Sequence, residues 1–138
     1  MSTHHSTSGT NVKQQQAAGF LHDLWTRKDR CAALPDDQRP ADRREGYAVQ
    51  AAFAHIHGSP VLGWKIAATS IDGQRHIGVD GPLAGRIYQD RMLPVGANVS
   101  LKSNLMHVAE IEFAFSFAKT MPLRSSEYSV AEVLDAVA

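Results

Sequence analysis

The chain has no excess charge, a single cysteine and no long apolar run, and each absence excludes a class of protein. Its 14 Lys and Arg residues balance 14 Asp and Glu residues, so no basic surplus points to nucleic acid or an anionic membrane. Cys31 alone cannot form an internal disulfide, which fits a reducing compartment. No run approaches the ~20 apolar residues that span a bilayer, and residues 1–16 lack the apolar segment of a signal peptide. We therefore expect a cytoplasmic protein with neither a nucleic acid nor a membrane partner.

The sequence also lacks a glycine-rich phosphate loop and a nucleophile elbow, which weakens nucleotide-binding and serine-hydrolase interpretations. What it has is 138 residues, 43% of them hydrophobic, which is enough for one core and predicts a single domain or part of one. Residues 1–12 have low hydrophobicity and no period, so we interpret them as a disordered tail.

Two helices are predicted in the N-terminal part. Apolar residues recur at helical spacing from Lys13 to Lys28, at Ala17, Phe20, Leu21, Leu24 and Trp25. A second helix begins near Pro40 and stops at Gly58, with a stripe formed by Val49, Ala52, Phe53 and Ile56. Its polar start, "ADRRE", is interpreted as a solvated face.

After Gly58 the period changes from helical to two, which predicts strands. In "VLGWKIAATS" the side chains of Leu62, Trp64, Ile66 and Ala68 would share one face. Asp72-Gly73 predicts a hairpin turn into a shorter run, "RHIGV", and another short strand is expected around residues 99–101.

The segment "AEIEFAFSFAKT" carries the clearest strand pattern. Ile111, Phe113, Phe115 and Phe117 would line one face of a strand over residues 108–119. The other face would hold Glu110, Glu112, Ala114, Ser116 and Ala118. Beyond it, Ser129 and Glu132 form a capping box at the start of a last helix. That helix has no stop signal before Ala138, so we expect the natural domain to continue.

Two glutamates on one strand face suggest a metal site. Residues i and i+2 of a strand project to the same side, so both carboxylates could converge on one cation. Oxygen ligands suit Mg²⁺ or Mn²⁺ better than Zn²⁺, and the small residues that follow Glu110 and Glu112 leave room for a bound group. The alternative is a half-exposed strand whose outer face happens to begin with two acids.

Lys65 and Asp80 are further candidates. Lys65 lies among small residues on the less bulky face of its strand, where a lysine can serve in proton transfer; the alternative is an ordinary solvent-facing lysine. An aspartate in "GVDGP" is more often simply a turn residue, which is the alternative for Asp80. His107 alternates onto the Ile111 face, and His55, His57 and His76 are interpreted as surface or loop residues.

Four segments in this order, "EGYAVQ", "GWKIAATS", "HIGVDGPLAGRI" and "AEIEFAF", resemble the 2-oxopent-4-enoate (2-keto-4-pentenoate) hydratase family of the fumarylacetoacetate hydrolase superfamily. The resemblance covers about residues 14–138. It implies an α+β fold in which a mixed β-sheet rolls into a barrel-like core, of the fumarylacetoacetase C-terminal type. Residues 13–60 would form its helical N-terminal region and residues 61–138 the first part of the rolled core.

The resemblance also implies a site. It places the metal ligands of the family's E-x-E motif on Glu110 and Glu112, and its catalytic lysine and aspartate on Lys65 and Asp80. Members bind Mg²⁺ or Mn²⁺ and act on 2-hydroxydienoates or 2-oxo acids in the meta-cleavage breakdown of aromatic compounds. The family pattern continues past Ala138, where it would supply a third carboxylate ligand and much of the pocket.

The implied reaction adds water to a 2-hydroxy-2,4-dienoate to give 4-hydroxy-2-oxopentanoate. In it the cation would stabilise charge on the 2-oxygen while Lys65 and Asp80 handle protons. 4-Oxalocrotonate decarboxylation and acylpyruvate hydrolysis are alternatives in the same superfamily. A further alternative is a truncated fragment that is inactive or depends on a partner. We expect a homo-oligomer, with a partner enzyme of the same pathway as a second form of assembly.

Overall fold

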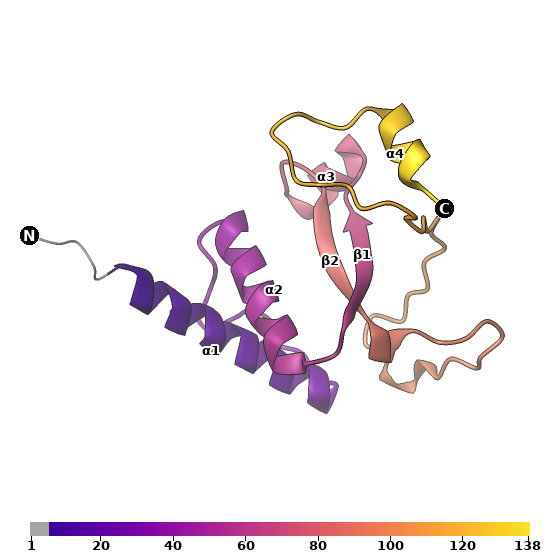
Figure 1. Cartoon of the computed structure of the whole chain (residues 1–138). Coiled ribbons are helices and arrows are strands. Elements are labelled where there is room, and N and C mark those ends of the chain that lie inside the picture. Colours follow the sequence, from indigo (N-terminus) through magenta and orange to yellow (C-terminus); the bar gives the residue numbers. More distant parts are fainter. Residues whose placement is uncertain (1–5) are drawn as a thin grey trace, which may run out of the picture. The chain divides into compact units, whose positions relative to one another are not determined.

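The computed structural model describes residues 6–138, which form four α-helices, two β-strands and two short 3-10 helices (Figure 1). Internal contacts divide the chain into unit 1, which extends to Leu105, and unit 2, Met106–Ala138. The described residues therefore form an α+β structure whose sheet is open and two-stranded. A closed barrel is not formed by residues 6–138.

The helices α1 (Ser6–Arg27) and α2 (Arg43–His57) pack against each other and contain the core of unit 1 (Figure 1). Ala17 and Ala18 are fully covered and Val49 is buried, and small side chains at such a contact let two helices approach closely. Partly buried side chains surround this core, namely Leu21, Ala52 and Phe53. The apolar stripes predicted for both helices thus provide the core.

The first helix begins earlier than the apolar pattern indicates. The prediction from Lys13 to Lys28 is confirmed, but α1 starts at Ser6, so residues 6–12 of the predicted tail are helical. Residues 1–5 of that tail lie outside the described residues.

Both ends of α2 follow from local side-chain chemistry. The side chain of Asp42 accepts a hydrogen bond from the Glu45 N–H, which satisfies one of the free donors at the helix start. At the other end Gly58 adopts a left-handed conformation with φ 73°, and its N–H donates to Ala54 O. The helix predicted between Pro40 and Gly58 is therefore confirmed.

The strands β1 (Val61–Ala67) and β2 (Leu83–Tyr88) form an antiparallel pair in which Ala67 is opposite Leu83 and Val61 is opposite Tyr88. A register shift lies between Val61 and Gly63. The strand predicted after Gly58 is confirmed. Its large apolar side chains stay about half exposed, at 56% for Leu62, 51% for Trp64 and 46% for Ile66.

The connection between the strands is a helix rather than a tight turn. The prediction of a hairpin turn at Asp72-Gly73, followed by a strand in "RHIGV", is wrong because these residues lie in or directly after α3 (Ile71–Ile77). Ser70 caps this helix by accepting a hydrogen bond from the Gly73 N–H. An aspartate and a glycine in a first helical turn therefore resemble a hairpin signal when the preceding cap is overlooked.

Two 3-10 helices follow β2, η1 (Gln89–Arg91) and η2 (Leu101–Ser103). The strand predicted around residues 99–101 is wrong, because this stretch has no strand pairing and passes into η2. A short apolar stretch forms a strand only when a neighbouring strand provides hydrogen-bond partners for its backbone groups.

Unit 2 is organised around α4 (Val130–Ala136), which begins with the predicted capping box. The Ser129 side chain accepts from the Glu132 N–H, and the Glu132 carboxylate accepts from the Ser129 N–H at 2.8 Å. Ala118 N–H donates to Ala136 O at 2.9 Å, and Phe117 forms an isolated bridge with Val137. The prediction of a helix at the end of the chain is confirmed.

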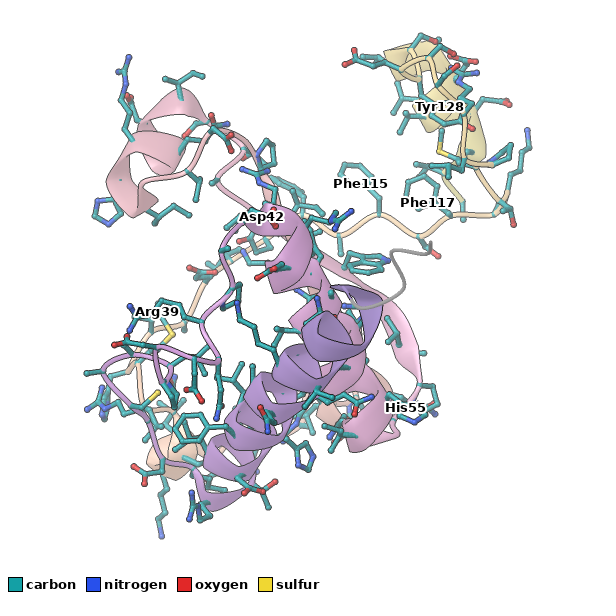
Figure 2. The ribbon with its side chains drawn as sticks, turned by 90° about the vertical axis from the view of Figure 1, so that its left-hand side faces the viewer. Arg39, Asp42, His55, Phe115, Phe117 and Tyr128 are labelled. Atoms are coloured by element: carbon teal, nitrogen blue, oxygen red, sulfur yellow. The ribbon has the colours of Figure 1, made fainter. Side chains whose placement is uncertain are left out.

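The strand predicted over residues 108–119 is wrong. Residues 108–116 have no regular secondary structure, and Phe117 makes only the isolated bridge. The large side chains of this segment, which we call the aromatic stripe, are exposed: Ile111 at 103%, Phe113 at 96%, Phe115 at 64% and Phe117 at 52%. Figure 2 shows the rings of Phe115 and Phe117 extending outward from the segment. Alternating side chains do not make a strand when no ladder pairs with it.

Candidate functional site

Lys65 lies in the middle of β1, directly opposite Gly85 of β2. It is partly buried, whereas its neighbours Trp64 and Ile66 on the other face are exposed. Residues that are opposite in an antiparallel pair lie on the same face, and Gly85 has no side chain to occupy the space there. The structure thus places Lys65 on the less exposed face of its strand, beside a position without a side chain.

Asp80 lies in the turn that leads into β2, and its side chain is 93% exposed. Its carboxylate is paired with the guanidinium group of Arg43, the first residue of α2. Arg43 also donates to Pro82 O at 3.0 Å. The aspartate therefore lies in a turn and is an ion-pair partner of α2, and its catalytic role stays a prediction.

Glu110 and Glu112 belong to unit 2 and are both exposed. They lie in the part of the chain that forms neither helix nor strand, residues 108–116. Side chains two residues apart project to one side in a strand, and this segment does not have strand geometry. Their assignment as metal ligands therefore stays a prediction based on the family resemblance.

The donor chemistry of these two residues suits a hard divalent cation, because both supply carboxylate oxygens. Within residues 6–138, no group of three or more His, Cys, Asp or Glu side chains is arranged to hold a metal ion. Mg²⁺ bound by one or two protein carboxylates commonly keeps several waters as its other ligands.

The segment "EGYAVQ" of α2 contacts β2, which its sequence did not predict. The hydroxyl of Tyr47 accepts a hydrogen bond from Ala84 N–H at 3.0 Å, and Gln50 Nε2 donates to Ala84 O at 3.0 Å. Arg86 of β2 in turn donates to the side-chain oxygen of Gln50. These two side chains of α2 therefore hold the backbone of β2, the strand that pairs with Lys65.

An aromatic cluster in unit 1 contains a histidine that was interpreted as a surface residue. The cluster consists of His22 and Trp25 of α1, Phe53 and His57 of α2, and Tyr88 of β2, with ring centroids 4.7 to 6.2 Å apart. The side chain of His57 is only 13% exposed, so its interpretation as a surface residue is wrong. Its spacing of four residues from Phe53 was the signal that could have placed it on the packed face.

The His57 ring is also paired with a carboxylate at the edge of the cluster. His57 Nε2 lies 3.1 Å from Asp90 Oδ1, and the hydrogen bond from His57 holds the pKa of Asp90 below its usual range. Burial raises the pKa of the Tyr88 hydroxyl. Arg91 lies over the ring of Trp25, with its guanidinium carbon 4.5 Å from the centroid. These contacts join α1, α2 and η1. The aromatic cluster therefore has a structural role in unit 1, where it holds these elements together.

Arg43 is the second residue whose position was missed. The sequence indicated only a polar helix start, and the contact with Asp80 joins residues 37 positions apart, so no local pattern announced it. A groove lies between α1 and α2, and none of the four predicted site residues lines it. The groove is lined by Gln14, Gln15, Ala48, Ala52, His55 and Ile56.

No protein-family model and no solved structure matches the chain. The resemblance of the four ordered segments to a family therefore stays a prediction from the sequence. In addition, none of the helices among residues 6–138 has the length and apolar character needed to cross a membrane.

Proposed function

We propose that the chain is a metal-dependent hydratase that adds water to a 2-hydroxy-2,4-dienoate (2-oxopent-4-enoate) and forms 4-hydroxy-2-oxopentanoate. The observation that carries this proposal is the order of four segments that resemble the 2-oxopent-4-enoate hydratase family. In it, Glu110 and Glu112 are metal ligands, and Lys65 and Asp80 transfer protons. The barrel-like core of that family is part of the proposal, with β1 and β2 as two of its strands.

Two features of unit 1 support the proposal. The segments "EGYAVQ" and "HIGVDGPLAGRI" contact each other through Tyr47, Gln50 and the backbone of Ala84, which is what a shared fold requires of two family motifs. Lys65 stands opposite a glycine, so the paired position of β2 contributes no side chain to that face. Both features concern the antiparallel strand pair, in which β1 carries Lys65 and β2 begins shortly after Asp80.

The reaction requires two kinds of assistance. Mg²⁺ or Mn²⁺, held by Glu110 and Glu112, would supply positive charge for the substrate carboxylate and its 2-oxygen. The carboxylate of Asp80 can accept the proton of the 2-hydroxyl group, and the ammonium group of Lys65 can donate a proton to the far carbon of the diene. Water then adds to the remaining conjugated double bond, so the product differs from the substrate by one water molecule.

The biological setting follows from the substrate class. Dienoates of this type arise from ring cleavage of aromatic compounds, so we place the enzyme in aromatic catabolism in the cytoplasm. We further propose that it acts as a homo-oligomer, because the apolar side chains of β1 are exposed in the single chain. A partner enzyme that delivers the reactive dienoate would be a second form of assembly.

The experiment follows the loss of dienoate absorbance after metal has been removed and then Mg²⁺ or Mn²⁺ has been added back. We expect activity only with metal, and the hydrated product should be identified by its mass. Glu110→Gln and Glu112→Gln should each lower kcat/KM by about 100-fold or more, since each removes a carboxylate ligand. Glu127→Gln is the matched control, because Glu127 is also an exposed glutamate of unit 2.

Three results would contradict the proposal: activity that does not depend on metal, a Glu110→Gln variant as active as the control, or no hydration at any metal concentration. Release of CO₂ from 4-oxalocrotonate without hydration would reassign the chain to the decarboxylases. Direct binding of Mn²⁺, measured by electron paramagnetic resonance with the same variants, separates loss of the metal from loss of the reaction.

A further inference from the structure

The guanidinium group of Arg43 contacts three consecutive residues of the turn before β2. Its Nη2 atom donates to Asp80 Oδ1 and lies 3.5 Å from Gly81 O, while Nη1 donates to Pro82 O at 3.0 Å. A guanidinium group is planar and has five N–H donors in fixed directions. One side chain thereby joins the carboxylate of Asp80 to the backbone of its own turn.

The guanidinium group lies directly against Gly81. A Cβ atom at this position would lie 3.4 Å from Nη1 and 3.8 Å from Nη2 of Arg43, which is ordinary van der Waals contact. The turn therefore presents two carbonyl oxygens and one carboxylate to Arg43 with no side chain between them.

The other end of the Arg43 side chain begins on an anchored element. Arg43 is the first residue of α2 and directly follows the helix cap Asp42. Glu45, two residues on, accepts from Ala41 N–H at 2.8 Å and pairs with Lys13 of α1 at 3.1 Å, and these contacts lower its pKa. The start of α2 is thus held against α1. The backbone position from which the Arg43 side chain extends is therefore fixed.

We propose that Arg43 is a positioning residue that orients the carboxylate of Asp80 for proton transfer. The inference rests on the proposed function, because orientation affects the reaction only if Asp80 takes part in it. The Arg43 side chain is 39% exposed and that of Asp80 is 93% exposed, and ion pairs with such exposure contribute little to stability. The loss of Arg43 should therefore be seen in catalysis rather than in the unfolding temperature.

The kinetic test compares Arg43→Gln with Arg44→Gln, which removes the same charge from the adjacent exposed position of α2. We expect Arg43→Gln to lower kcat by about 10- to 100-fold with little change in KM and Tm, as misplacement of a reacting group does. Arg44→Gln should behave like the parent protein. Arg43→Lys should recover part of the loss, because an ammonium group can pair with the carboxylate but cannot hold the two carbonyls as well.

The same change in an Asp80→Asn background separates positioning from other effects. If Arg43 acts through Asp80, Arg43→Gln should cause no further loss in that background. A loss of equal size in both backgrounds, or an Arg43→Gln variant as active as Arg44→Gln, would overturn the inference.

A measurement without substrate distinguishes failure of this inference from failure of the proposed function. Three-bond couplings measured by NMR report whether the Asp80 side chain keeps one χ1 rotamer. We expect one rotamer in the parent protein and in Arg44→Gln, and averaging in Arg43→Gln. If the parent protein shows this pattern but no hydratase activity, the proposed function fails and the positioning stands. If Asp80 keeps the same rotamer in Arg43→Gln, the positioning role is wrong whatever the activity.

Discussion

Aromatic and large apolar side chains gather in two regions of the chain, and their surroundings differ. The aromatic cluster of unit 1 draws on α1, α2 and β2, and its rings stack at centroid distances such as 4.8 Å between Trp25 and Phe53. The aromatic stripe of unit 2 comes from one continuous segment, and Phe113 in its middle is 96% exposed. The rings of the cluster are covered by residues distant in sequence, whereas Ile111 and Phe113 of the stripe are almost fully exposed.

The difference shows what a periodic pattern can and cannot produce. Apolar residues at helical spacing make a helix from local hydrogen bonds, and that helix then offers one face for packing. Alternating residues need a second strand before their backbone groups are satisfied. β1 meets β2 and is a strand, while residues 108–116 meet no strand among the described residues and are irregular.

The largest expected effect comes from the cluster. Trp25→Ala removes the ring that stacks on Phe53 and His57 and lies under Arg91, so it should lower the free energy of unfolding by about 2–4 kcal/mol. Chemical denaturation followed by circular dichroism measures the change. The matched variant in the stripe is Phe113→Ala, for which we expect a change within about 0.5 kcal/mol. Equal effects at both positions would remove the distinction between the two regions.

A smaller effect is expected where α2 holds the sheet. Tyr47→Phe removes the hydroxyl that accepts from Ala84 N–H, and loss of one such partly buried hydrogen bond costs about 1 kcal/mol. Hydrogen exchange of the Ala84 amide should become faster. Tyr128→Phe removes a hydroxyl in unit 2 that donates to Pro122 O, so it serves as the control and should leave that amide unchanged. Unchanged exchange in Tyr47→Phe would mean that the Tyr47 hydroxyl does not protect the Ala84 amide.

The smallest expected effect on stability is confined to α4, the helix of unit 2. Hydrogen bonds from Arg124, and then from the backbone and side chain of Ser129, lower the pKa of Glu132 from 4.5 to about 2. Because the folded-state pKa is depressed, the stabilising contribution is fully present above pH 4.5 and is lost as the pH falls toward 2. Carbon chemical shifts of residues 130–136 should report a loss of helix over this range.

Glu132→Gln tests the assignment of this acid-dependent step. The variant should have a less stable α4 at neutral pH and should lack the change between pH 4.5 and 2. Glu127→Gln is the control and should keep it. The explanation fails if the step persists in Glu132→Gln.

The predictions from sequence succeeded where the signal is local. The cap at Ser129, the stop at Gly58 and the stripe that contains Val49 all lie within a few residues of the feature they predict. They failed at Asp72-Gly73, where a helix cap and a turn use the same residue types, and at residues 108–119, where the pattern needed a partner strand. The candidate site shows the same mixture of success and failure. Lys65 lies in the strand predicted for it, whereas the strand predicted for Glu110 and Glu112 is not formed.

The sequence by itself determined α2 with its ends, the start of α4 and the strand that carries Lys65, because hydrogen bonds and caps of this kind join residues close along the chain. Only the tertiary structure decided that Arg43 pairs with Asp80, that His57 is covered by Trp25, and that Tyr47 holds β2. These contacts join residues about 30 or more positions apart, and such pairings depend on how elements pack, which no local pattern encodes.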